Sequence, residues 1–155
     1  PTLVRGNASE ILSLAGHSAQ TKGVESTDSV ERALAAAQAL AKRHGCVVCV
    51  SGAQDHVLAP DGRQAVLRNG HPLMPRVTGV GCSASALVGA FAAVQPDAWR
   101  ACTSAMAYWG VVGQIAAARI APNTGTGSYA SALLDVASTL SQDALAATLR
   151  AEALA

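Results

Sequence analysis

Blocks of apolar and polar positions along this chain predict a mixture of helices and strands. The uncharged run Cys46–Val50 shows no apolar–polar alternation, which is typical of a buried strand in a parallel sheet. Before it, apolar residues at helical spacing predict a helix from Asp28 to Arg43. Asp28 and Glu31 have the spacing of a capping box, and Gly45 is the expected stop of this helix.

The first residues predict the end of a strand followed by a short helix. Pro1–Val4 looks like the tail of a strand, and Asn7 would begin a helix over Ala8–Ala15 that Gly16 ends. The polar stretch His17–Ser26 is expected to be a loop.

Turn-forming residues after the apolar strand predict a hairpin. The segments His56–Ala59 and Gln64–Arg68 flank Pro60-Asp61-Gly62, a typical turn sequence. A loop with two prolines is expected next, over Asn69–Thr78.

The remaining sequence predicts three helices and a helical tail. They span Cys82–Val94, a long segment opened by Pro96-Asp97 and running to about Ile120, and about Ala130–Leu140 after a loop over Pro122–Ser128; the Ala-rich tail is also expected to be helical. This order of elements indicates an α/β protein with too few strands to complete its own sheet.

Composition restricts the classes of partner. The 155 residues fit one domain, and because 50% are hydrophobic but only 3% aromatic, Ala, Val and Leu must build most of the core. With a formal net charge of +1 and no basic cluster interleaved with aromatics, we expect no nucleic-acid partner. The uncharged stretches Val77–Pro96 and Ala101–Ala118 contain Gly, Ser, Thr and Gln, which favours buried helices over membrane spans. No secretion signal is visible, so the cytoplasm is the expected location.

The four cysteines do not form a metal-binding pattern. Cys46 and Cys49 have C-x-x-C spacing, but residues three apart on a strand point to opposite faces and cannot chelate one ion. We therefore interpret both as small core residues.

The segment Thr78-Gly79-Val80-Gly81-Cys82 carries the clearest candidate chemistry. Glycines let a ligand approach the backbone, and the free amides of a following helix attract an anion such as phosphate. A thiol in the first helical turn ionises more readily, so Cys82 could serve as a base. A tight turn beside a buried cysteine explains the same residues without a ligand.

Two further groups of residues allow a structural and a functional interpretation. Asn7 and Glu10 have capping-box spacing, but beside Arg5 they could also hold Mg²⁺-bound water and a nucleotide phosphate. Ser51-Gly52 follows the apolar strand, at the edge where open α/β sheets bind ligands, and could equally be a simple turn.

Four aromatic or histidine positions receive simpler interpretations. His71 is expected to be a structural hydrogen-bonding residue, and Trp99 and Trp109 are expected in the core. The segment Gly125–Tyr129 could be either a turn or a contact at the rim of a site.

Taken together, these segments resemble the hydroxyethylthiazole kinases of thiamine salvage, within the ribokinase-like superfamily. The resemblance covers nearly the whole chain and rests on VRGNASEILSLAG (4–16), KGVES (22–26), VVCVSGAQDHV (47–57), RNGHPLMPRVTGVGCSASALVGAFAAV (68–94) and GTGSYASALLD (125–135). It implies a three-layer α/β/α fold of which residues 1–155 form the C-terminal part of a single kinase domain. Family members carry a further N-terminal portion, so this chain is expected to be part of a longer protein or to pair with a separate polypeptide.

The resemblance also implies an activity. It is the ATP-dependent transfer of a phosphoryl group to the primary alcohol of 4-methyl-5-(2-hydroxyethyl)thiazole. In such enzymes the Gly-x-Gly-Cys segment forms the anion hole, and its cysteine takes the alcohol proton; these positions are Gly79, Gly81 and Cys82. Val80 stands where the family usually has Thr, which removes a hydroxyl but leaves the backbone amides, so we expect the anion hole to survive.

Other roles follow from the same resemblance. Arg5 and Ser51 match ATP contacts, Ser51 replacing a frequent Thr while keeping the hydroxyl, and Gly79 also matches a substrate contact. Asn7 and Glu10 match the Asn-x-x-Glu motif that organises magnesium. A homotrimer is implied as well. Two alternatives stay open: a hydroxymethylpyrimidine kinase, and a non-catalytic fragment that binds nucleotide or only takes part in assembly.

Overall fold

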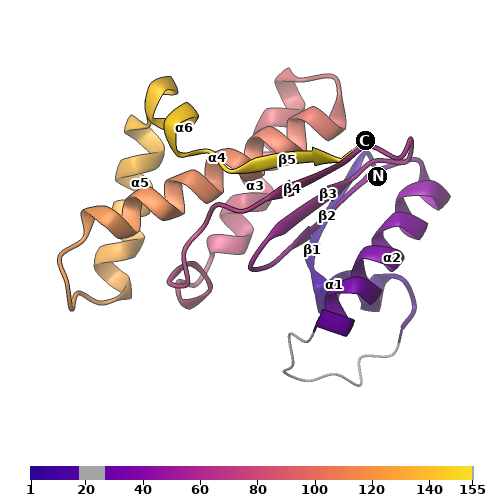
Figure 1. Ribbon diagram of the computed structural model, residues 1–155, viewed down its shortest axis with the longest axis horizontal. Coiled ribbons are helices and arrows are strands. Elements are labelled where there is room, and N and C mark those ends of the chain that lie inside the picture. The colour runs from indigo at the N-terminus through magenta and orange to yellow at the C-terminus, as the bar shows by residue number, and fades with distance from the viewer. Residues whose placement is uncertain (18–26, 155) are drawn as a thin grey trace.

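A computed structural model describes residues 1–17 and 27–154, with side chains described from residue 30 onward in the second range. At its centre lies a five-stranded sheet in the order β1-β2-β3-β4-β5 (Figure 1). The strands are β1 (Leu3–Asn7), β2 (Val47–Ser51), β3 (Asp55–Leu58), β4 (Gln64–Leu67) and β5 (Ala151–Leu154). The first two are parallel, whereas each later strand runs antiparallel to its neighbour. The predicted parallel strand and hairpin are thus confirmed.

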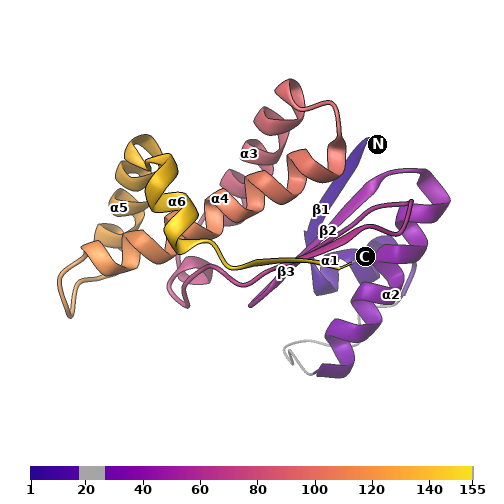
Figure 2. The ribbon, with the colours of Figure 1, turned by 45° about the horizontal axis from the view of Figure 1, so that its top comes forward.

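Helices cover both faces of this sheet. Their bounds are α1 (Ala8–Leu14), α2 (Thr27–His44), α3 (Val80–Val94), α4 (Ala98–Arg119), α5 (Thr126–Thr139) and α6 (Gln142–Thr148), with a 3₁₀ turn at Met74–Arg76. One face is covered by α1 and α2, while α3 and α4 cover the other and α5 packs against α4 (Figures 1 and 2). The result is the predicted three-layer α/β/α arrangement.

Strand β2 separates two hydrophobic cores, which explains its uninterrupted apolar sequence. Val48 and Val50 pack with α1 and α2, whereas Val47 and Cys49 pack with α3 and α4. Cys46 belongs to the first core and Cys49 to the second, so the predicted opposite placement is confirmed. A hydrogen bond with the Cys102 side chain, together with burial, raises the pKa of Cys49 well above its ordinary value. Cys49 is therefore a protonated thiol within the second core.

Local capping signals set several helix ends as predicted. The Asp97 carboxylate accepts hydrogen bonds from the backbone N–H groups of Trp99 and Arg100 at the start of α4. Helix α3 begins at Val80, two residues earlier than expected, because Gly79 adopts a left-handed conformation (φ +92°) and caps it.

Other boundaries differ from the prediction or fall outside the description. Helix α5 begins at Thr126, so the expected loop over Pro122–Ser128 is too long. The predicted loop after His17 lies almost wholly outside the described residues. The expected capping box at the start of α2 involves the side chain of Asp28, which also lies outside them.

The prediction that the whole Ala-rich tail is helical is wrong. Helix α6 ends at Thr148, and β5 then pairs antiparallel with β4, with Ala151 opposite Leu67. Arg68 N–H donates to the Arg150 carbonyl (2.9 Å) and extends this ladder. The free edge of β4 supplies backbone hydrogen bonds that outweigh the weak helix preference of a short tail. Within the described ranges, we find no helix that combines the length and the apolar character needed to span a bilayer.

Candidate functional site at one edge of the sheet

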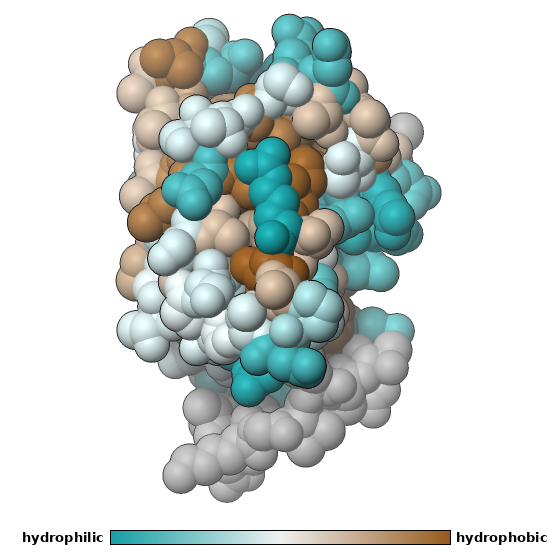
Figure 3. Space-filling view, turned by 90° about the vertical axis from the view of Figure 1, so that its left-hand side faces the viewer, coloured by the Kyte–Doolittle hydropathy of each residue, from teal (hydrophilic) through white to brown (hydrophobic). Residues whose placement is uncertain are grey.

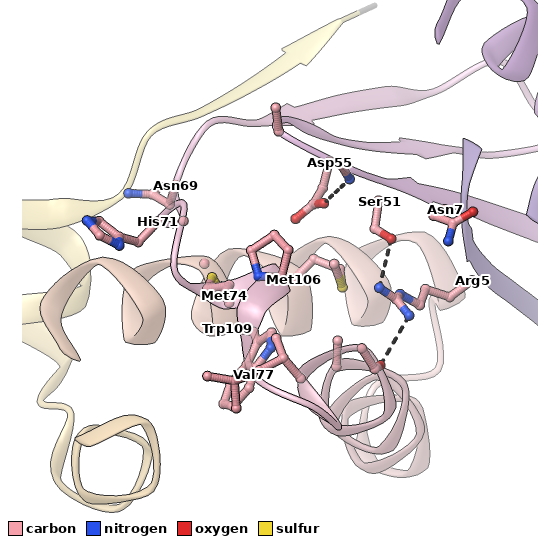
Figure 4. Close-up of a pocket in the computed structure, with 18 of the residues that line it drawn as sticks. Arg5, Asn7, Ser51, Asp55, Asn69, His71, Met74, Val77, Met106 and Trp109 are labelled. Carbon is pink, nitrogen blue, oxygen red and sulfur yellow. Dashed lines mark hydrogen bonds between the residues drawn. The ribbon is translucent and has the colours of Figure 1, made fainter. Parts of the chain in front are cut away.

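A pocket of about 720 Å³ opens at the edge of the sheet where β1 and β2 end and β3 begins (Figure 4). This is the edge at which open α/β sheets bind ligands, and the volume suits a small molecule. Five of the seven predicted site residues line it: Arg5, Asn7, Glu10, Ser51 and Gly81. They come together because Asn7 and Ser51 are register partners of parallel strands and α3 begins beside them.

Arg5 connects three elements at this pocket. Its Nη2 donates to Ser51 Oγ (2.7 Å) and its Nη1 to the Gly81 carbonyl in the first turn of α3 (3.1 Å). A Cβ at Gly81 would lie 3.1 Å from Arg5 Nη1, so a glycine there leaves room for the guanidinium. Among the residues that the structure describes, the buried Nε has no acceptor. Arg5 thus places a positive charge beside the pocket, and its Nε–H has no partner among the described residues.

The amino end of α3 has the features of an anion site. Ser83 N–H donates to the Gly79 carbonyl (2.8 Å) and Val80 N–H to the Val77 carbonyl (3.4 Å). No acceptor within the described ranges takes the N–H groups of Gly81 and Cys82. Free amides at the positive end of a 15-residue helix attract negative charge.

Two of the predicted site residues do not line this pocket. Gly79 caps α3 without contributing to the pocket wall, and the Cys82 side chain is exposed on the surface of α3. The interpretation of Cys82 as a buried cysteine beside a tight turn is therefore wrong. Of the four cysteines it alone is exposed, since Cys46, Cys49 and Cys102 are buried.

Asn7 and Glu10 form the capping box that their spacing predicted. Asn7 Oδ1 accepts from Glu10 N–H (2.9 Å) and from Ser9 Oγ (2.8 Å), while Glu10 Oε2 accepts from Asn7 N–H (2.7 Å). A Cβ at Gly6 would lie 3.1 Å from Glu10 Cβ, so this glycine lets Glu10 pack over the end of β1. No group of three or more His, Cys, Asp or Glu side chains in the described ranges could hold a metal ion alone.

The pocket also contains an aspartate that the sequence analysis missed. Asp55, the first residue of β3, is partly buried and accepts a hydrogen bond from Gly52 N–H through Oδ1 (3.1 Å). Burial raises the pKa of Asp55 to about 6, against the lowering effects of the Gly52 N–H and the Arg5 charge. Its position at the start of a strand, just after the Ser51-Gly52 turn, was the available signal.

Asn69 is a second residue that the sequence analysis missed. Only 6% of its surface is exposed, and Nδ2 donates to Gln114 Oε1 (2.8 Å) and to the Thr148 carbonyl (2.9 Å). Its Oδ1 accepts from Arg150 N–H (2.5 Å). Asn69 thus connects the segment between β4 and the 3₁₀ turn, which we call the pocket loop, to α4 and to the segment before β5. Only its place after a strand, before a glycine, hinted at this role.

Two of the four aromatic or histidine positions, His71 and Trp109, match their expected roles. His71 Nδ1 accepts from Leu73 N–H (3.2 Å), which confirms a structural histidine, and Trp109 is 5% exposed in the core while also lining the pocket. Trp99, expected in the core, is only partly buried and stacks under Arg63. Tyr129 is neither a turn nor a rim residue: it is buried within α5 and donates to the Gly113 carbonyl (2.9 Å), and burial raises its pKa to about 12.

Comparison with known proteins assigns this arrangement to a family. A family model described as the hydroxyethylthiazole kinase family matches residues 1–143. A hydroxyethylthiazole kinase of Leptothrix cholodnii is 63% identical over 136 residues, which cover 87% of this chain and 49% of that protein. One of Cereibacter sphaeroides is 50% identical over 154 residues, covering 99% of this chain and 56% of that protein.

A solved structure agrees with these sequence matches. The hydroxyethylthiazole kinase protein from Pyrococcus horikoshii OT3 superposes with a TM-score of 0.82 at 28% identity. The match covers 99% of this chain and 55% of that structure. The chain therefore spans about half the length of the relatives that it matches.

Proposed function

The chain belongs to the hydroxyethylthiazole kinase family, and on that premise we propose that it is the ATP-binding and proton-accepting part of a kinase of thiamine salvage. The substrate is the primary alcohol of 4-methyl-5-(2-hydroxyethyl)thiazole. The observation that supports this most is the convergence of Arg5, Ser51 and Gly81, with its free N–H, on one pocket. A guanidinium and helix-start amides are groups that bind and neutralise phosphate.

In the proposed reaction, the alcohol oxygen forms a bond to the γ-phosphorus of ATP. The bond from that phosphorus to its bridging oxygen breaks, and the electron pair leaves with ADP. In its thiolate form, Cys82 accepts the alcohol proton and becomes a thiol, which later releases this proton to solvent. Arg5 and the amides of Gly81 and Cys82 stabilise charge on the migrating phosphoryl group, which is the main task of a protein in this chemistry. Gly79, which lacks a side chain, leaves space for the substrate at the start of α3.

Magnesium belongs to the proposal, and Glu10 fits it. One carboxylate oxygen of Glu10 accepts from Asn7 N–H, which leaves the other available at the pocket. Mg²⁺ is commonly held by one or two carboxylates together with substrate phosphates and water, and would neutralise phosphate charge when bound. Asn7 would hold Glu10 in place, because its own oxygen already accepts two hydrogen bonds.

We propose further that the half of the fold found in the relatives, and not spanned by this chain, packs against β1 and α3. Strand β1 pairs only with β2 in the described sheet, so its other edge is free to add a parallel strand. Helix α3 has no charged residue, and Val94 at its end is 84% exposed. A polypeptide covering this surface would place the thiazole alcohol beside Cys82.

Thiol labelling tests this arrangement, because Cys82 is the exposed cysteine of the four. An uncharged maleimide should modify Cys82 readily in this chain alone. After assembly with the remaining half, taken for example from the Leptothrix cholodnii relative, labelling should slow at least tenfold. Unchanged labelling of an assembled complex would place the partner elsewhere.

A homotrimer in the cytoplasm, where ATP and Mg²⁺ are available, completes the proposal. On the end of the molecule formed by α5 and α6, hydrophobic side chains reach the surface between hydrophilic ones (Figure 3), and Leu134 of α5 is 70% exposed. Sedimentation equilibrium of the assembled protein should give three copies, and a monomeric mass would refute this part.

Kinetics of Cys82→Ala test the assignment of the base. Turnover should fall at least ~10²-fold, with little change in KM for ATP, because the proton would lose its acceptor. Ser83→Ala, at the next exposed position of α3, is the matched control and should retain activity. A Cys82→Ala enzyme with undiminished turnover would remove Cys82 from the mechanism.

Turnover measurements and calorimetry separate the two alternatives. Turnover of the pyrimidine alcohol in preference to the thiazole alcohol would identify a hydroxymethylpyrimidine kinase. Calorimetry of this chain with ATP and Mg²⁺ should show binding, whereas the absence of any heat would favour a pure assembly role.

A further inference from the structure

Asp55 occupies the middle of the pocket, and the reaction proposed above does not use it. In Figure 4 its carboxylate lies between the Arg5–Ser51 pair on one side and the loop of Asn69 and Met74 on the other. Oδ1 accepts from Gly52 N–H (3.1 Å), and within the described ranges no protein donor bonds to Oδ2. One oxygen of a partly buried carboxylate is therefore available to a ligand.

The electrostatic surroundings make this free oxygen a strong acceptor. Burial raises the pKa of Asp55 to about 6, so the group is mainly ionised at neutral pH despite incomplete solvation. An ionised carboxylate accepts hydrogen bonds and donates none. Because a buried charge without its full set of hydrogen bonds is costly, a ligand donor at Oδ2 would be favoured.

The two ends of the pocket restrict which part of a nucleotide can reach Asp55. Arg5 and Gly81, with its free N–H, lie at one end and suit the phosphates. Met74 and Trp109 supply an apolar wall towards the other (Figure 4), which suits a base. A nucleotide lying between these ends has its ribose in the middle. The ribose hydroxyls are donors, whereas a phosphate would be repelled by the Asp55 carboxylate.

We propose that Asp55 accepts a hydrogen bond from a ribose hydroxyl of the bound nucleotide and thereby selects ribonucleotides over deoxynucleotides. This inference rests on the proposed function, since it requires a nucleotide with its phosphates at Arg5. A carboxylate that reads a ribose hydroxyl has a physical precedent in dinucleotide-binding sheets, where an acidic residue does so.

Calorimetric titration of three nucleotides tests the proposal. ATP, 2′-deoxy-ATP and 3′-deoxy-ATP are titrated into the wild-type protein and into Asp55→Ala. Removing the hydroxyl that contacts Asp55 should weaken wild-type binding about 10- to 100-fold, the range for a hydrogen bond to a charged group. Asp55→Ala should bind ATP only as weakly as the wild type binds that deoxynucleotide. The variant and the wild type should bind the deoxynucleotide itself with equal affinity. Such non-additivity isolates one contact.

Two further variants keep the test decisive. Asp55→Asn retains an oxygen for Gly52 N–H and should lose most of the discrimination, even if Asp55→Ala fails to fold. Asp135→Asn removes one negative charge at an exposed position of α5 and should discriminate as the wild type does.

Other results would overturn the proposal. Equal wild-type affinity for the three nucleotides would overturn the ribose contact alone. The proposal would also be overturned if Asp55→Asn lost the same amount of affinity for all three nucleotides and that loss became smaller at higher Mg²⁺ concentration. Such a result would assign the carboxylate to the metal. If ATP did not bind to the wild-type protein at all, the proposed function would fail and this inference with it.

Discussion

Replacing Asn69 by Ala should remove the main polar connection between the pocket loop and the C-terminal segment. The side chain makes three hydrogen bonds: with Gln114 Oε1 on α4, with the Thr148 carbonyl at the end of α6, and with Arg150 N–H before β5. It is 6% exposed, so water cannot readily replace it. Asn69→Ala therefore leaves Gln114 Oε1, the Thr148 carbonyl and the Arg150 N–H without this hydrogen-bond partner.

The magnitude follows from these three bonds. Each net hydrogen bond contributes about 1 kcal/mol, and a buried partner left unsatisfied adds to the loss. We expect the free energy of unfolding to fall by about 3 kcal/mol, within a range of about 2–4 kcal/mol. At about 2–4 °C per kcal/mol for a protein of this size, Tm should fall by about 6–12 °C.

Urea unfolding followed by circular dichroism measures this loss, and Gln114→Ala is the matched comparison. That variant removes one of the three bonds and should cost about 1 kcal/mol. Hydrogen exchange adds a local measure, because the β4–β5 ladder between Leu67 and Ala151 should exchange faster in Asn69→Ala. If Asn69→Ala cost no more than Gln114→Ala, the three bonds would not act as described.

Two other predictions concern the same pocket. Gly110→Ala places a Cβ 3.0 Å from the Asn69 carbonyl oxygen, and the overpacking cost of about 1–3 kcal/mol should exceed the gain in helix propensity of about 1 kcal/mol. Its control, Gly89→Ala, has open space and should stabilise the protein; urea unfolding that shows the same change for both would refute the steric argument. The stability of Asp55→Asn relative to wild type should increase as pH rises from 3.8 to about 6. The pKa of Asp55 is higher in the folded than in the unfolded state, so ionisation of Asp55 lowers the stability of the wild type by about 3 kcal/mol. If the free energy of unfolding changed by the same amount between pH 4 and pH 8 in wild type and variant, the predicted effect of Asp55 ionisation would be refuted.

The sequence by itself determined the features that depend on neighbours along the chain. The apolar run before Ser51 requires burial on both faces, and alternation along a strand places Cys46 and Cys49 in different cores. The Asn7–Glu10 box and the Asp97 cap act within one helical turn, so residue type and spacing were sufficient to predict them. The glycines and cysteine at the start of α3 likewise predicted an anion site, and the segment that contains them was one of five that carried the resemblance to the family.

Only the tertiary structure decided the features that join distant segments. The tail pairs with β4 because that strand presents a free edge, a fact that its own alanines do not encode. Asp55 and Asn69 enter the pocket because antiparallel pairing returns the ends of β3 and β4 to the edge where β1 and β2 finish. Exposure of Cys82 likewise depends on what packs around α3. Local periodicity describes the face of one element, whereas a site needs several elements whose relative positions are set by long-range packing.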